Sequence, residues 1–238
     1  MRASQKGEFE KAILDFEKVM VREPSSALAV KAARQSARVC YIHLKNFEKA
    51  AYFYRELVLN SPDADERLNA QKQIALIYTE NISKPDVAVR ELSKLLSMLK
   101  QPQERFLYRL ALARSSYHLK NMTQSLLEID ELMREKTSGS DEFSLWVLKG
   151  NVHLAQKDLT KSAQAFEKAM QMDASRAVRE NVAIQLAVAF EEMKDFEKAI
   201  RVLKNMKPYH PQPDYIEIRI RRLLERQRSQ PGAMGFRK

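Results

Sequence analysis

Side chains capable of catalytic chemistry are few and scattered in this sequence of 238 residues. No two histidines have the spacing of a zinc-binding helix, and the four lie far apart: His43, His118, His153 and His210. Neither Gly139 nor Gly150 belongs to a phosphate-binding loop, and no Gly-x-Ser-x-Gly nucleophile elbow occurs. We therefore expect no catalytic residues, no metal and no cofactor, and a protein that is not an enzyme.

Cys40 is the single cysteine, which excludes an intramolecular disulfide. Its neighbours on an expected helix are apolar, so we expect a buried small hydrophobe rather than a nucleophile. His43 and His118 stand at equivalent places near two helix ends; a repeated architecture explains them, with a ligand role as the alternative. The acidic residues of one short stretch are expected to form a solvated face rather than an acid–base pair: Glu128, Asp130 and Glu131.

Basic residues number 41 against 31 acidic ones, and the excess lies at the two ends of the chain. Residues 1–62 hold 11 basic and 7 acidic residues, and residues 214–238 hold 7 and 3. Arginines form a basic end patch: Arg219, Arg221, Arg222, Arg226 and Arg228. Guanidinium groups on one helix can neutralise phosphates, but Glu217 and Glu225 interrupt this run. A solvated capping helix is therefore favoured over a nucleic-acid site, and an acidic protein partner would use the same charges.

An internal repeat sets the elements that carry these side chains. The word Phe-Glu-Lys-Ala-Ile occurs at 9–13 and again at 196–200, with related words between. A small residue recurs in these words at intervals of 38, 38, 37, 37 and 37 residues: Ala12, Ala50, Ala88, Ser125, Ser162 and Ala199. Within each unit, apolar residues follow the helical period twice, with a polar turn between the two stretches. The sequence therefore predicts tandem pairs of helices and an all-α fold.

The small residue is expected where the two helices of a pair cross, because a larger side chain would push them apart at a cost of about 1–3 kcal/mol. The residue four positions later lies one turn along the same helix face. We expect these larger residues to fill the layer between units: Phe16, Tyr54, Leu92, Ile129, Phe166 and Leu203.

The pattern resembles the tetratricopeptide repeat family over roughly residues 1–213. Ala12, Phe16 and Pro24 match the Ala, Phe and Pro of the family's second helix. Trp146 and Gly150 match the Trp and Gly of its first helix. The resemblance implies a right-handed α-solenoid of tandem helix–turn–helix repeats with a C-terminal capping helix.

The chain also departs from the family pattern. Lys149 and His153 stand where Leu and Tyr are usual, and Arg38 replaces an expected small residue, which leaves the register of that helix open. The period exceeds the family's 34 residues, so each first helix is expected to start about one turn early. Such lengthened repeats resemble those of bacterial scaffold and envelope-assembly proteins of this family.

The first repeat is expected to be incomplete, because fewer residues precede Ala12 than precede the small residue of any other unit. We predict repeats at 1–24, 25–62, 63–102, 103–138, 139–175 and 176–213, a capping helix at 214–229 and a flexible tail at 230–238. The open first repeat would expose an apolar face, which is also a candidate for self-association: Phe9, Ile13, Phe16 and Met20. Either upstream residues have been removed, or the chain starts with a frayed half-repeat.

Stacked helix pairs provide a concave groove, made mostly from the first helices and long enough for a peptide or a partner helix. The helix phases place polar and apolar residues in it: Gln35, Val39, Ile42, Asn69, Lys72, Leu76, Leu110, Arg114, Tyr117, Val147, Asn151, Leu154, Ile184 and Val188. Family members that clamp a C-terminal carboxylate use paired Lys and Asn. Here Val147 precedes Asn151 by one turn, so the clamp is not reproduced. Packing between repeats is the alternative interpretation of each groove residue.

The sequence therefore predicts a non-catalytic scaffold or adaptor that binds a protein segment in its groove. Two alternatives stay open: a regulatory or cargo-binding arm of a larger protein or membrane-anchored lipoprotein, and a nucleic-acid-associated factor that uses the basic end patch. No apolar run of about 18 residues and no intact signal peptide occurs, so the chain as given is expected to be soluble. Its compartment stays open between the cytoplasm and, after removal of an upstream signal, the periplasm.

Overall fold

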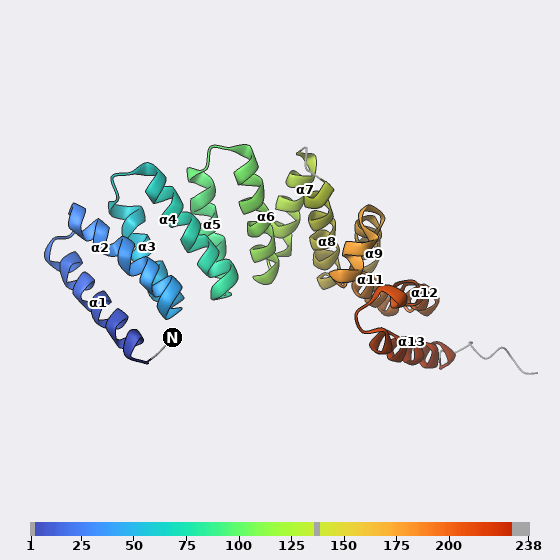
Figure 1. Ribbon diagram of the computed structural model, residues 1–238. Coiled ribbons are helices and arrows are strands. Elements are labelled where there is room, and N and C mark those ends of the chain that lie inside the picture. The colour runs from blue at the N-terminus through green and yellow to red at the C-terminus, as the bar shows by residue number, and fades with distance from the viewer. Residues whose placement is uncertain (1–2, 136–138, 230–238) are drawn as a thin grey trace, which may run out of the picture. The chain divides into compact units, whose positions relative to one another are not determined.

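The computed structural model describes residues 3–135 and 139–229, in which helices follow one another and no segment is a strand (Figure 1). Two compact units divide the chain, Met1–Asn121 and Met122–Lys238. Within each unit, consecutive helices pack against each other. The predicted all-α fold of tandem helix pairs is confirmed.

In the first unit, α1 packs on α2, and the pairs α2–α3 and α4–α5 follow before α6. The helices are α1 (Ala3–Arg22), α2 (Ala27–Arg38), α3 (Phe47–Asn60), α4 (Ala64–Leu76), α5 (Pro85–Met98) and α6 (Pro102–His118). Two of them, α2 and α4, continue into the π-helical turns η1 (Val39–Leu44) and η2 (Ile77–Asn81). The core between these helices holds Ile13, Phe53 and Ile74, each at most 1% exposed.

The second unit continues the pattern with α7 (Met122–Arg134), α8 (Gly139–Ala155), α9 (Leu159–Met172), α10 (Ala174–Arg179), α11 (Val182–Glu192), α12 (Phe196–Met206), the 3-10 turn η3 (Lys207–Tyr209) and α13 (Pro213–Arg228). The pair α8–α9 is followed by α11–α12, and the short α10 is separated from α11 at Asn181, where φ is +60°. The final helix, α13, packs Ile216, Ile220 and Leu223 on the core of this unit, as expected of a capping helix. The predicted tail at 230–238 lies outside the described residues.

The turns between first and second helices share one backbone conformation. A residue with a φ between +53° and +63° follows each first helix: Lys45, Ser83, Lys120, Lys157 and Lys194. In three of these turns the next residue caps the second helix; the Asp158 carboxylate, for example, accepts a hydrogen bond from the backbone amide of Lys161. The polar residues at these turns therefore determine where one helix ends and where the next begins.

The π-helical turns account for the two longer repeat intervals. η1 lies in the interval Ala12–Ala50 and η2 in Ala50–Ala88, and these are the intervals of 38 residues. Because a π-helical turn adds one residue to a helix, the small buried position of the first helix moves back by one, to Ala37 and Ala75. Arg38, which stood where the sequence pattern expected a small residue, is exposed.

The small residues of the second helices lie at buried positions, at most 1% exposed: Ala50, Ala88, Ser125, Ser162 and Ala199. In the α8–α9 pair, the Ser162 hydroxyl donates a hydrogen bond of 2.9 Å to the backbone carbonyl oxygen of Gly150. A Cβ atom built on Gly150 would lie 2.5 Å from the ring of Phe166, which is fully buried. The two helices therefore approach so closely that only glycine fits at this point.

We predict that Gly150→Ala lowers the thermal midpoint of the protein. Alanine is favoured over glycine inside a helix by about 1 kcal/mol, but displacing the Phe166 ring costs about 1–3 kcal/mol. Gly7→Ala in α1 is the matched control, because a Cβ there meets no atom within 4 Å, and it should leave the midpoint unchanged or raise it. Circular dichroism melts compare the variants; a Gly150→Ala protein as stable as the parent would contradict the close crossing.

A buried carboxylate joins three helices of the first unit. Glu91 on α5 accepts hydrogen bonds from the Gln71 amide on α4, at 2.9 Å, and from the Arg55 guanidinium on α3, at 3.3 Å. Burial acts to raise the pKa of Glu91, but the Gln71 hydrogen bond and the charges of Lys94 and Arg55 outweigh it and hold the pKa below its ordinary value. The side chain therefore stays charged and paired, and it fixes α4 between its two neighbours.

His153 on α8 is buried, with 7% of its surface exposed, and its Nδ1 atom has no hydrogen-bond partner among the described residues. Burial disfavours the charged imidazolium and lowers the pKa of His153; Lys161 and Lys149 act in the same direction, while Asp158 and Asp130 oppose them. The imidazole is therefore neutral near neutral pH in the folded protein. Tyr78 and Phe190 hold the equivalent buried position in two other repeats, and Cys40 and Ser116 hold it in the remaining two.

We predict that His153 makes the protein less stable in acid. Below the ordinary histidine pKa of about 6.5 the unfolded chain binds a proton that the folded chain resists, so the stability present above that pH is lost as the pH falls. His153→Phe should therefore lose less of its thermal midpoint between about pH 7.5 and pH 5.5 than the parent does. His118→Gln, at an exposed position, should behave as the parent. If the thermal midpoints of all three proteins fall equally with pH, His153 is not the cause of the acid sensitivity.

Candidate functional site

Cys40, His43 and His210 make contacts that belong to the packing and turns of the fold. Cys40 is fully buried, and burial raises the pKa of its thiol to about 11, so the thiol is protonated near neutral pH. His43 stacks on Phe9 with 4.5 Å between ring centroids, and His210 accepts a hydrogen bond on Nδ1 from the backbone amide of Gln212 at 3.0 Å.

Across residues 3–135 and 139–229, no group of three or more His, Cys, Asp or Glu side chains is placed to hold a metal ion. None of the helices described is both long enough and apolar enough to cross a membrane.

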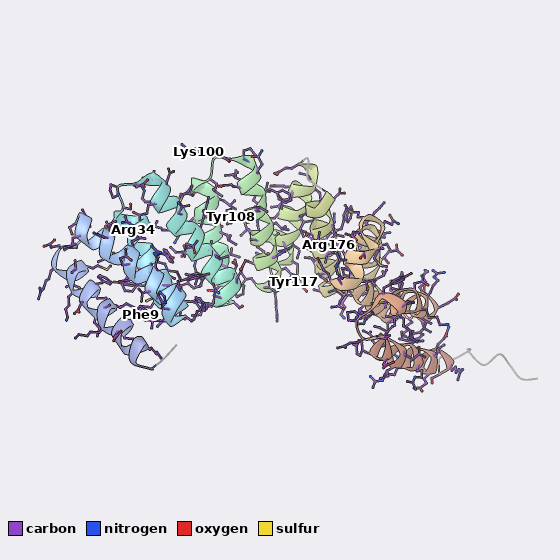
Figure 2. The ribbon with its side chains drawn as sticks, in the orientation of Figure 1. Phe9, Arg34, Lys100, Tyr108, Tyr117 and Arg176 are labelled. Carbon is purple, nitrogen blue, oxygen red and sulfur yellow. The ribbon has the colours of Figure 1, made fainter. Side chains whose placement is uncertain are left out.

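Ion pairs join the first helices of the first unit to one another. Arg34 on α2 donates to Glu66 on α4 with both an Nε and an Nη2 hydrogen bond, the latter at 2.9 Å. Lys72 on α4 contacts Glu104 on α6 at 3.0 Å. The Arg34 hydrogen bond holds the pKa of Glu66 below its ordinary range, so this pair stays charged. The helices α2, α4 and α6 therefore lie in a row and share a surface, of whose residues Figure 2 labels Arg34 and Tyr117.

We call this surface the first-helix face of the first unit, defined by Arg34, Gln35, Arg38, Asn69, Lys72, Leu76, Leu107, Arg114 and Tyr117. Of the residues predicted from the sequence, Gln35, Ile42, Asn69 and Arg114 are exposed. Others are half-buried: Val39, Lys72, Leu76 and Tyr117. Leu110 is buried, and Val39 contacts the core, so packing accounts for both. The face thus offers polar side chains beside partly covered apolar ones.

Sequence reasoning missed three residues of this face: Arg34, Arg38 and Leu107. Counted from the buried small residue of each first helix, Arg34 is equivalent to Lys72 and Arg38 to Leu76, one position before the predicted Gln35 and Val39. The offset comes from η1, and the sequence showed two signs of it: the 38-residue interval Ala12–Ala50, and Arg38 at a place where a small residue was expected. Leu107 is 59% exposed on α6 and is equivalent to Asn69 on α4.

An open hollow of about 560 Å³ adjoins this face near the start of α4 and the α5–α6 turn. Its walls carry charges of both signs and some apolar surface: Asp65, Leu68, Asn69, Lys72, Met98, Lys100 and Glu104. The Lys72–Glu104 ion pair lies in its wall. The hollow therefore extends the first-helix face and does not form a separate enclosed site.

In the second unit, the predicted groove residues are all half-buried: Val147, Asn151, Leu154, Ile184 and Val188. Val147, Leu154 and Ile184 contact the core, so packing explains these three. Arg176, which sequence reasoning did not single out and which Figure 2 labels, lies with its Cζ atom 4.2 Å from the centre of the Phe143 ring and donates to the Ser144 hydroxyl at 3.1 Å. Here a cation–π contact and a hydrogen bond tie α10 to α8.

The predicted apolar face of the first repeat is largely covered. Ile13 is 1% exposed, and Phe9, Phe16 and Met20 are half-buried. Phe9 stacks on His43 of η1, and Met20 packs against the adjoining core. Ile13 therefore belongs to the core and not to an exposed face. The exposed apolar residues of α1 are Leu14 and Val21 instead.

The arginines of the basic end patch divide into two groups. Arg219 and Arg226 both pair with Glu191 on α11, and the Arg226 guanidinium also lies 5.2 Å from the centre of the Phe196 ring. Arg221, Arg222 and Arg228 are exposed at the helix surface. Two of the five positive charges therefore hold α13 against its unit, and the other three lie at its surface.

Comparison with known proteins agrees with the repeat pattern. A family model described as the tetratricopeptide repeat matches residues 143–176, which span α8 and α9. No curated protein matches the sequence.

Solved structures share the fold at low sequence identity. A MamA RS-1 ArsTM double mutant is 16% identical, with a TM-score of 0.58 over 84% of this chain and 97% of that one. YrrB, described as a TPR protein with an unusual peptide-binding site, is 13% identical, with a TM-score of 0.57 over 87% and 97%. BtubC from P. vanneervenii is 13% identical, with a TM-score of 0.55 over 97% and 94%. The family model thus identifies residues 143–176 as a tetratricopeptide repeat, and the chain shares its fold with solved structures that include a described TPR protein.

Proposed function

We propose that this protein is a non-catalytic scaffold that binds a peptide or helix of a partner on its first-helix face. The fold is that of protein–protein interaction scaffolds in general. The observation that carries the finer proposal is the row α2, α4 and α6, which brings side chains from three repeats onto one surface. A partner segment lying across the row would contact all three helices at once.

The chemistry of the face suits a short polypeptide segment. Leu107 is 59% exposed and offers an apolar contact, while Gln35 and Asn69 offer amide groups that can pair with a peptide backbone. Arg38 and Arg114 add exposed positive charge on α2 and α6. Since Arg34 and Lys72 are already paired with carboxylates, the exposed Arg38 and Arg114 are the residues from which we expect contacts to partner carboxylates.

One structural neighbour supports this proposal. YrrB is described as having a peptide-binding site, on a fold with a TM-score of 0.57 to this chain. At 13% identity that similarity concerns the fold alone, so the residues that bind must be tested in this chain.

We predict that Arg114→Glu combined with Tyr117→Ala abolishes peptide binding and shifts the thermal midpoint little. Arg114 is exposed and Tyr117 half-buried, so their loss removes surface contacts and little core packing. Peptides selected from a displayed random library on the parent protein, then measured by fluorescence anisotropy, should bind the double variant at least about tenfold more weakly.

The charge reversal needs a control at an exposed lysine that lies outside the first helices and pairs with no buried group. Lys31 lies on the first helix α2, and Lys94 pairs with the buried Glu91, so neither is suitable. Lys168→Glu, at an exposed position on the second helix α9, is therefore the matched control for the charge reversal. It should bind the selected peptides as the parent does. Peptides that bind the double variant and the parent equally well would assign binding to another surface and refute the proposal.

A further inference from the structure

The outer side of the capping helix α13 carries apolar side chains where a terminal cap is usually polar. Ile216, Ile220 and Leu223 face the core, and Ile218, which lies on the opposite side of the helix, is 42% exposed. Tyr215, one turn before it, is 46% exposed. The helix therefore has a second, smaller apolar stripe that the described residues of its own unit leave accessible.

Arginines flank this stripe. Arg221 and Arg222 come three and four residues after Ile218, so they lie on the same side of α13, and both are exposed. Arg219 and Arg226, by contrast, are paired with Glu191. The capping function of α13 thus uses one pair of arginines and leaves the other pair beside Ile218.

The neighbouring surface of α12 and η3 adds further positive charge. Glu217 on α13 accepts a hydrogen bond from Lys207 at 2.7 Å, and Arg221 and Lys204 also act on it electrostatically. One carboxylate therefore faces three cations, and the region keeps a positive excess after its internal ion pair is made.

We propose that Tyr215, Ile218, Arg221 and Arg222, the outer cap face, dock a short acidic segment of a protein partner. An apolar side chain of the segment packs on Ile218 and Tyr215, and its carboxylates pair with the two arginines about one helical turn away. Tyrosine and arginine around an apolar centre are the residue types enriched in the cores of protein interfaces. This surface is distinct from the first-helix face and does not depend on its function.

The limits of the face favour a protein segment over a nucleic acid. Asp214 precedes it and Glu225 follows it, so the positive stretch spans about 10 Å along the helix. An extended phosphate backbone would meet both carboxylates, and it offers no apolar group for Ile218. A peptide with one or two turns of acidic residues fits between them.

A labelled synthetic helix tests the proposal. The probe is a fluorescein-labelled peptide of about 16 residues, with one leucine flanked by glutamates in its two central turns and alanine or glutamine elsewhere, titrated with the full chain by anisotropy. We expect Ile218→Ser and Arg222→Glu each to weaken binding by about tenfold or more. Lys168→Glu, an equal charge change at an exposed position on α9, and Arg114→Glu on the first-helix face should each change it less than about twofold.

The other outcomes would overturn the proposal. Absence of binding by the parent protein would refute the docking face. Binding that survives Ile218→Ser would leave only general charge attraction. Tighter binding of a mixed-sequence DNA or RNA oligonucleotide, or of phosphatidylserine vesicles, that is lost in Arg222→Glu and kept in Ile218→Ser would assign the face to a polyanion instead. Melting curves of both variants should match the parent, since both side chains are exposed.

Discussion

The close crossing of two helices at a small residue is the constraint on which this structure depends. At the α8–α9 crossing, Gly150 admits no Cβ beside the Phe166 ring, and the Ser162 hydroxyl bonds to the Gly150 carbonyl oxygen. Such contact lets each helix pair bury a continuous apolar layer with few residues, so the pairs can stack within each unit. The first-helix face exists because these crossings fix the direction of the first helices.

The constraint also explains how the repeats tolerate an extra residue. In the second and third repeats the additional residue is taken up as a π-helical turn at the end of the first helix, between the two small residues of the crossing. The buried position moves to Ala37 and Ala75, both at most 1% exposed, and the crossing is preserved. The surface changes instead: Arg34 replaces Gln35 as the equivalent of Lys72. A packing requirement in the core thus decides which side chains are offered to a partner.

The polar interactions have two roles: some hold neighbouring helices together, and others align the first helices. Glu91 with Gln71, and Glu191 with Arg219 and Arg226, hold helices together within their own units. Ion pairs between first helices align the row that forms the first-helix face. Arg114, Arg221 and Arg222 remain exposed at the surface. These are the charges on which the two proposed docking surfaces, the first-helix face and the outer cap face, depend.

The repeat spacing, the helix pairs, the capping helix and the burial of Cys40 could all be predicted from the sequence, because helical period, turn residues and small residues at crossings are local signals. The exact face of α2 could not, since a π-helical turn depends on which backbone hydrogen bonds the surrounding packing favours. The sequence also could not predict that Ile13 is buried, or which of the C-terminal arginines pair with Glu191. Those depend on contacts with α2, η1 and Glu191, residues far away in the sequence, which only the folded chain brings within reach.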